Sequence, residues 1–178
     1  MDDVKKRFGE ELSGQSIRIT SFHLTPHLPM HLFNFSIGNY VEIRLERGQQ
    51  LTPSLSMSIF CRQNLYKACL ASSELIFKTL KYAVNFYQSL FHYPFVFQKL
   101  DTIFVPELSY GAMETPGAVT YGEFLLPKLG EELTAFKKTF LTLVLFHETA
   151  HMWFGNHVTM KWWDDLWLKE SFADYVAY

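Results

Sequence analysis

The segment HETAH at residues 147–151 constrains the fold more than any other part of the sequence. Its two histidines are four residues apart, which on a helix places them about 40° apart in azimuth and about 6 Å apart along the axis. Two imidazoles on one helix face reach a single ion, at about 2.1 Å each for zinc. Glu148 lies one residue further round, where it contacts a water on the metal but not the metal.

The spacing of these histidines also occurs on helices that bind no ion, so the surroundings have to decide between the two interpretations. Residues 140–146 read FLTLVLF, which indicates a helix that is apolar nearly all round and therefore buried. Burying two imidazoles and a carboxylate without partners costs on the order of 2 kcal/mol or more per group. One metal ion satisfies all three groups, which favours a metal site with a third ligand elsewhere.

Two residues are candidates for the third ligand. His157 has the spacing of the HExxHxxGxxH motif, but Phe154 stands where that motif needs a glycine for a sharp turn. Glu170 follows His151 after eighteen residues and lies on the next predicted helix, which can bring its carboxylate to the metal. Asp174 would share that helix face and hold the free ring nitrogen of a ligand histidine, or it is a solvated surface carboxylate. The pattern favours Glu170 and leaves His157 as the alternative.

Strand patterns come first along the chain. Residues 33–37 and 41–45 alternate apolar and polar side chains around Gly38 and Asn39, which predicts a β-hairpin, and residues 55–60 predict a further strand. Thr102 to Val105 predicts a strand that lies at a sheet edge or ends at Pro106. Residues 117–126 are another strand candidate, and residues 158–162 a short extended piece.

Helical periodicity begins at about residue 64 and breaks at Pro94. Further helices are predicted at residues 131–154 and from Asp164 or Asp165 to the end of the sequence. The mixture of elements predicts an α+β fold. The last helix has no stop signal, from which we expect this sequence to be a fragment of a longer protein.

Composition excludes several classes of protein. Apolar residues make up 48% of the chain, which excludes disorder, and a net charge of −2 without a basic block argues against nucleic acid as a partner. Cys61 and Cys69 read as ordinary thiols. The charged N-terminal residues 1–14 lack an apolar segment, so we expect no signal peptide and a cytoplasmic location. No segment indicates a membrane, since residues 140–146 are too few to span one.

Two motifs together resemble the aminopeptidase N family of zinc metallopeptidases. Residues 147–175, HETAHMWFGNHVTMKWWDDLWLKESFADY, are similar to that family's zinc-binding region nearly end to end. GAMET at residues 111–115 resembles the family's GAMEN exopeptidase motif, and the two motifs have the right order and spacing. The resemblance is strongest over about residues 101–178.

The resemblance implies a role for each matching residue. One zinc per chain would be held by His147, His151 and Glu170, with Glu148 as the general base. Glu114 would bind the free α-amine of a peptide substrate. The residues that would line the substrate through their backbone are Gly111, Ala112 and Met113.

The implied fold is the N-terminal half of a thermolysin-like catalytic domain at residues 46–178. The last strands of an all-β domain would precede it at residues 1–45. Two departures from the family stand out: Thr115 replaces the usual asparagine, and neither Tyr175 nor Tyr178 matches the transition-state tyrosine, which lies further downstream. The expected function is therefore a zinc aminopeptidase, with a non-catalytic zinc-binding fragment or a zinc endopeptidase as alternatives.

Overall fold

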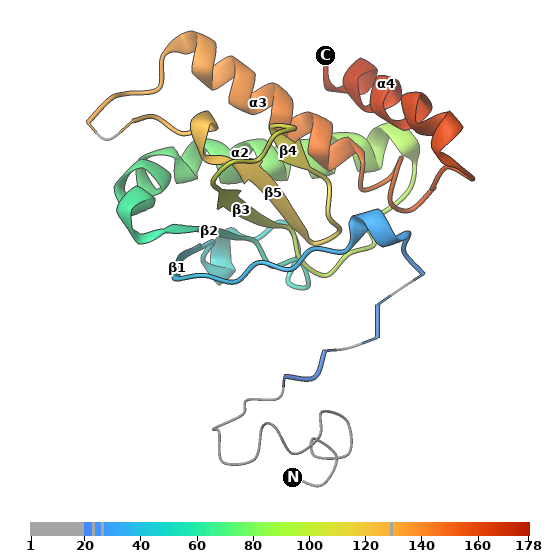
Figure 1. Cartoon of the computed structure of the whole chain (residues 1–178), viewed down its shortest axis with the longest axis horizontal. Coiled ribbons are helices and arrows are strands. Elements are labelled where there is room, and N and C mark those ends of the chain that lie inside the picture. The colour runs from blue at the N-terminus through green and yellow to red at the C-terminus, as the bar shows by residue number, and fades with distance from the viewer. Residues whose placement is uncertain (1–19, 23, 26, 129) are drawn as a thin grey trace, which may run out of the picture.

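The computed structural model describes residues 20–22, 24–25, 27–128 and 130–178. The charged stretch at residues 1–14 lies outside this range. Within the described residues, the fold is a five-stranded sheet with three α-helices on one side of it (Figure 1). The strands are β1 (Tyr40–Arg44), β2 (Ser58–Arg62), β3 (Asp101–Val105), β4 (Ala112–Met113) and β5 (Ala118–Gly122). The helices are α2 (Tyr66–Phe91), α3 (Ala135–Ala150) and α4 (Leu166–Ala177). The α+β class predicted from the sequence is confirmed.

The sheet is mixed, with the strand order β1-β2-β3-β5-β4. The three inner strands are parallel, whereas β1 and β4 run antiparallel to their neighbours at the two edges. Of the two alternatives for Pro106, the sheet edge is wrong and the strand end is right, because β3 lies in the middle of the sheet and ends at Val105. The short strand β4, which the patterns did not predict, forms the edge instead.

The hairpin predicted around Gly38 and Asn39 is wrong. Residues 33–39 form no strand, and Phe33, Phe35 and Ile37 are 60%, 83% and 79% exposed. β1 pairs instead with β2, whose inward side chains are fully buried. A strand gains more from joining a buried sheet than from a two-stranded hairpin, which is marginal in water. The pairing of β1 with β2 thus joins residues on both sides of the division expected after residue 45, and that division stays a prediction.

The helices match the predicted segments, with shifted ends. α2 ends at Phe91, where His92 takes a left-handed conformation (φ 51°) just before Pro94. α3 begins later than predicted because the Thr134 hydroxyl accepts a hydrogen bond from the Lys137 N–H at 3.2 Å and caps the helix. It also ends earlier, at Ala150. Residues 158–162 form an isolated bridge at Val158 and no strand.

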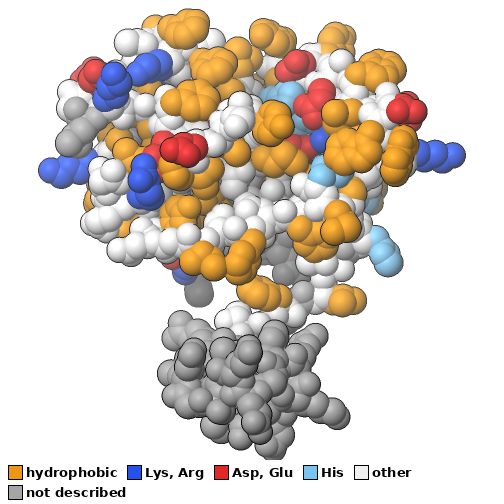
Figure 2. Space-filling view, viewed as in Figure 1, with side chains coloured by type: hydrophobic (Ala, Val, Ile, Leu, Met, Phe, Trp, Pro, Cys, Tyr) orange, Lys and Arg blue, Asp and Glu red, His pale blue; other side chains and the backbone are white. Residues whose placement is uncertain are grey.

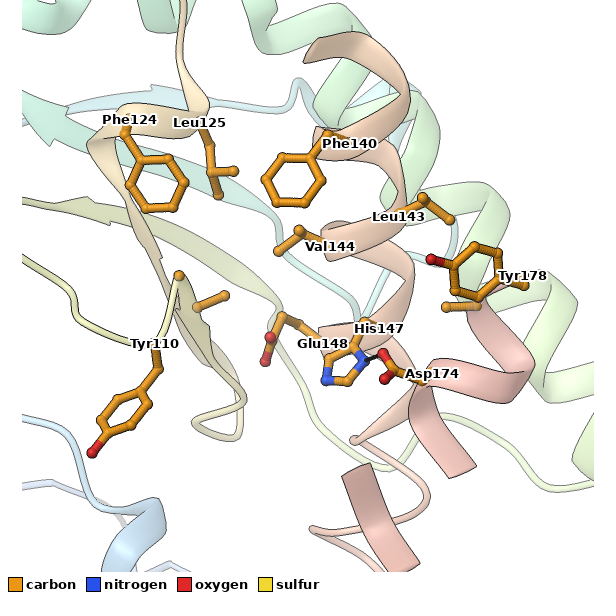
Figure 3. A pocket seen from close by; sticks show the side chains of 13 residues that line it. Tyr110, Phe124, Leu125, Phe140, Leu143, Val144, His147, Glu148, Asp174 and Tyr178 are labelled. Carbon is orange, nitrogen blue, oxygen red and sulfur yellow. Dashed lines mark ion pairs between the residues drawn. The ribbon is translucent and has the colours of Figure 1, made fainter. Parts of the chain in front are cut away.

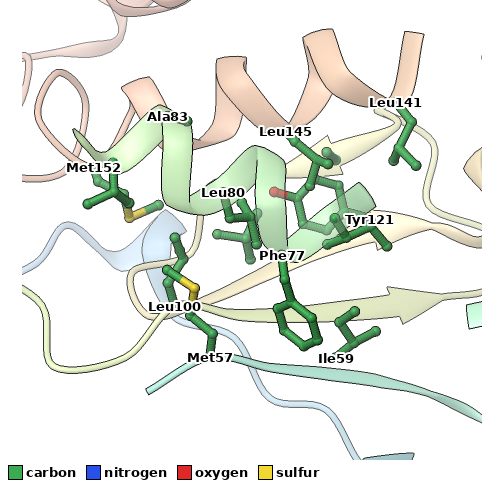
Figure 4. Packing of buried hydrophobic residues seen from close by; sticks show 14 of the residues in the cluster. Met57, Ile59, Phe77, Leu80, Ala83, Leu100, Tyr121, Leu141, Leu145 and Met152 are labelled. Carbon is green, nitrogen blue, oxygen red and sulfur yellow. The ribbon is translucent and has the colours of Figure 1, made fainter. Parts of the chain in front are cut away.

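The core fills the space between the sheet and the helices (Figure 4). Leu80 of α2, Leu145 of α3 and Tyr121 of β5 meet there and are at most 1% exposed. The Tyr87 hydroxyl lies within hydrogen-bond distance of the carbonyls of Phe146 and Val176, at 3.2 and 3.3 Å. This contact ties α2 to both α3 and α4; the candidate ligands lie on α3 (His147), directly after it (His151) and on α4 (Glu170).

Many apolar side chains remain on the surface, as Figure 2 shows for one face. Among them, Trp162 and Trp167 are 67% and 63% exposed. Within the described part of the chain, no helix combines the length and apolar character needed to cross a membrane.

Candidate metal centre

Three side chains from two helices converge on one point. The Nε2 atoms of His147 and His151 are 3.0 Å apart, and each lies 3.4 or 3.3 Å from Oε2 of Glu170. Ligand atoms about 2.0–2.1 Å from a tetrahedral zinc are separated by about 3.3–3.4 Å, so both distances to Glu170 match a zinc site and the distance between the two imidazole nitrogens is slightly short. The structure brings together the three residues that the sequence favoured.

The hydrogen bonds behind the two imidazoles aim their lone pairs at this point. The Nδ1 atom of His151 is 3.1 Å from the Phe154 carbonyl, which only accepts, so Nδ1 carries the proton. The Nδ1 atom of His147 is 2.8 Å from Oδ1 of Asp174, which likewise accepts. In the neutral rings both Nε2 lone pairs therefore face each other and the Glu170 oxygen. Three electron-rich atoms at this separation repel one another unless a cation lies between them, so the donor set fits a metal ion.

The charges around the triangle also favour a cation. Burial acts to raise the pKa of Glu170, but hydrogen bonds that the two histidines donate through Nε2 when their rings are protonated outweigh burial and hold the pKa far below its usual value. Burial lowers the pKa of His147, yet the carboxylates around it, Glu170 first, raise the pKa above its ordinary value overall. The pocket thus stabilises positive charge at the imidazoles.

Glu148 is placed next to the triangle but outside it. Figure 3 shows its carboxylate beside the His147 ring. The side chain is 5% exposed, and burial raises the pKa of its carboxyl to about 8. Its Oε2 atom has no hydrogen-bond partner among the described residues. A buried carboxylate oxygen without a partner is available to accept a proton from a small molecule bound at the metal position.

The turn after α3 connects the metal position to the GAMET segment. Gly155 (φ 132°) adopts a backbone conformation that residues with a Cβ rarely adopt, and a Cβ there would lie 3.0 Å from Nδ1 of His151. Asn156 follows, is 4% exposed, and donates a hydrogen bond of 2.7 Å to the Glu114 carbonyl. Sequence reasoning missed Asn156, although its position directly after a turn glycine was a signal.

Glu114, the predicted amine ligand, is buried at 4% exposure. Its carboxylate forms an ion pair with the ammonium of Lys169, which is equally buried. Burial acts to raise the pKa of Glu114, but His151 and Lys169 reverse this and lower the pKa. Sequence reasoning missed Lys169, and nothing local could have revealed that a lysine in the first turn of α4 points inward.

The residues before Glu114 line the edge of the sheet. Ala112 and Met113 form β4 and pair with Tyr121 and Thr120 of β5. Gly111 (φ 84°) precedes them in a left-handed conformation. As the last strand in the order, β4 leaves one side without a neighbouring strand.

His157, the alternative third ligand, is not brought into the cluster. The groups of possible ligands found among the described residues do not include it. Its ring is exposed and packs against Tyr93, with ring centroids 4.7 Å apart. The turn at Gly155 comes one residue too late to direct it towards the imidazoles.

A pocket of about 260 Å³ opens beside His147 and Glu148 (Figure 3). Gly111 and Ala112 border it on the sheet side, whereas Glu114 does not contribute to it. Its other walls are mostly apolar and aromatic: Tyr110, Phe124, Leu125, Phe140, Leu143, Val144, Asp174, Ala177 and Tyr178.

Comparison with known proteins finds similarity over most of the chain. A profile of the peptidase family M1 domain matches residues 76–178. An aminopeptidase N from Streptomyces lividans is 35% identical over 160 residues, which cover 89% of this chain and 18% of that protein. A leucyl aminopeptidase from Saccharolobus solfataricus is 34% identical over 160 residues, or 90% and 19% of the two chains. The aminopeptidase Q of Homo sapiens is 33% identical over 171 residues, or 95% and 16%. The chain thus spans less than a fifth of the length of these relatives.

Proposed function

Because this chain belongs to peptidase family M1, we propose that it is the metal-binding part of a zinc-dependent aminopeptidase that removes the N-terminal residue from peptides. One observation carries the proposal. The donor triangle of His147, His151 and Glu170 is close to tetrahedral zinc dimensions, and the buried carboxylate of Glu114 lies within 4.8 Å of a ring nitrogen of His151. An ion and an amine ligand at that separation suit a peptide bond next to a free N-terminus.

Zinc is the ion that suits two imidazoles and one carboxylate best, at one ion per chain. A zinc ion held there would act as a Lewis acid on water and on the peptide carbonyl. Glu148, whose buried Oε2 atom has no hydrogen-bond partner among the described residues, would accept the proton of the attacking water and pass it to the leaving amine. Asp174 keeps the His147 ring in the orientation and tautomer that zinc requires.

The substrate runs antiparallel to β4. Its N-terminal ammonium lies at Glu114, and the chain continues past Ala112 and Gly111 along the free side of the edge strand. The pocket bordered by these two residues has mostly apolar walls, so it would receive an apolar side chain of the substrate. Gly111, Ala112 and Met113 contact the peptide through their backbone groups.

The wider architecture follows from the family and is also part of the proposal. Residues 46–178 form the N-terminal half of a thermolysin-like domain, and residues 1–45 the end of a preceding β-domain.

Metal analysis and hydrolysis assays test the proposal on the 178-residue chain and on a longer form of the protein. We expect about one zinc per chain, retained by Glu148→Gln but not by Glu170→Gln. In the longer form, a fluorogenic aminoacyl amide should be hydrolysed by the parent sequence and not by Glu148→Gln. Zinc binding without turnover in both forms would leave a non-catalytic zinc-binding protein, and equal cleavage of N-acetylated and free peptides at an internal bond would indicate an endopeptidase. A chain that binds no zinc would refute the proposal.

A further inference from the structure

The Lys169 ammonium lies beside Glu114, at the position where the α-ammonium of the proposed substrate would bind. Its side chain is only 5% exposed, and its Nζ atom contacts Oε1 of Glu114 and lies 3.1 Å from Oε1 of Glu170. The carboxylate proposed to bind an α-ammonium therefore already has an ammonium group beside it.

The local structure is arranged to hold this lysine inside. On the same helix turn, Trp167 and Leu168 are 63% and 43% exposed, whereas Lys169 is 4% exposed. The helix thus turns two apolar side chains outward and the charged one inward, which reverses the ordinary preference. Gly155 leaves room for the lysine stem, because a Cβ at that position would lie 3.3 Å from Cδ of Lys169. A buried lysine of this kind is stable only while its carboxylate partners remain.

This contact changes what Glu114 contributes to binding. A substrate with a free N-terminus displaces Lys169 and exchanges one ammonium–carboxylate pair for another, with no net gain of an ion pair. A substrate with a blocked N-terminus leaves the internal pair intact. We propose, on the basis of the proposed function, that Lys169 is a specificity-determining residue that competes with the substrate ammonium for Glu114. This competition weakens the discrimination between substrates with free and with blocked N-termini.

Two probes on the zinc-loaded 178-residue chain test this by calorimetric titration: leucinamide, which carries a free ammonium, and N-acetyl-leucinamide, which does not. We expect the parent chain to bind the two with affinities within about threefold of each other, since the pair is exchanged rather than gained. Lys169→Met keeps the stem and removes the charge, and should favour leucinamide by about tenfold or more. Lys169→Arg, the matched control that keeps the cation, should behave like the parent chain.

Several outcomes would overturn the inference. These are a parent chain that already prefers leucinamide by about tenfold, an unchanged ratio in Lys169→Met, or a zinc-loaded Lys169→Met chain that binds neither probe. A lysine that only neutralises Glu114 would change the melting temperature and not the ratio. Zinc content measured on the same samples separates the two proposals: full zinc with the wrong ratios rejects the role of Lys169 alone, whereas missing zinc rejects the proposed function.

If Lys169→Met does not fold, an NMR measurement on the parent chain still tests whether the substrate ammonium displaces Lys169. The lysine ammonium signals are followed by nitrogen-15 NMR while each probe is added. Displacement by leucinamide should shift one protected ammonium signal, assigned with Lys169→Arg, and N-acetyl-leucinamide should leave it in place. A signal that ignores both probes, or responds to both equally, contradicts the competition.

Discussion

The hydrogen bond between Asp174 and His147 gives the most direct test of the metal centre. Oδ1 of Asp174 accepts from Nδ1 of His147 at 2.8 Å, and this bond leaves the Nε2 lone pair facing the metal position (Figure 3). Asp174→Ala removes the acceptor, so the ring is free to rotate and to carry its proton on either nitrogen. Zinc would then have to select one orientation and one tautomer from several, and its affinity falls.

The size of this effect follows from the exposure of the carboxylate. Loss of a partner behind a ligand histidine lowers metal affinity by about 10- to 100-fold. The Asp174 side chain is 70% exposed, so solvent and salt screen its charge and water replaces part of the hydrogen bond. We therefore expect a decrease near the lower limit, about tenfold, which corresponds to about 1.4 kcal/mol of zinc-binding free energy.

Competition with a chromophoric chelator measures this change at fixed pH and salt. Asp174→Asn keeps an acceptor oxygen without the charge and should recover most of the affinity. Asp164→Ala removes a similarly exposed carboxylate that lies in the turn before α4, and should leave the affinity unchanged. Zinc affinity of Asp174→Ala within about twofold of the parent value would refute the reasoning, because the ring orientation would then be set by other contacts.

Three further outcomes are expected. Zinc at one hundred times its dissociation constant should raise the unfolding free energy of the parent chain by about 2.7 kcal/mol, as measured by thermal denaturation. His157→Ala should show the same increase, and Glu170→Gln should show none. Tyr87→Phe removes the buried hydroxyl between α2, α3 and α4 and should lower the unfolding free energy by about 1–2 kcal/mol in urea titrations. Burial raises the pKa of Asp101, so its favourable contribution to the unfolding free energy is present below about pH 4 and is lost as pH rises through the raised pKa. Asp101→Asn should lack this decline when the unfolding free energies of the variant and the parent chain are measured across that pH interval.

The structural features that depend only on local sequence patterns were predicted best. The helical period over α2 and the break at Pro94 depend on neighbouring residues only, and both agree with the structure. The same holds for the spacing of His147 and His151, since helix geometry fixes their relation. Glu170 needed one further assumption, that a short return brings the next helix back alongside, and the α3–α4 packing satisfies it.

The features that depend on contacts between distant segments could not be predicted from the sequence. The alternation at residues 33–37 resembles a strand, but strand formation requires a partner, and none is present for it in the described chain. β4 is only two residues long, too short for any alternation to be recognised. Lys169 reads as an ordinary surface lysine beside a ligand, because its inward direction depends on where α4 packs against the turn at Gly155.

The metal position and the amine-binding end share one set of supports, which explains why both sequence motifs occur together. Asn156, in the turn that follows His151, holds the Glu114 backbone, and Lys169, one residue before Glu170, holds its carboxylate. Glu114 is therefore held by one residue from the turn that follows His151 and by the residue that precedes Glu170. Under the proposed function, a rearrangement of the α3–α4 turn would move the ion and the amine ligand together, so the distance between them, which would select the first peptide bond, would be preserved.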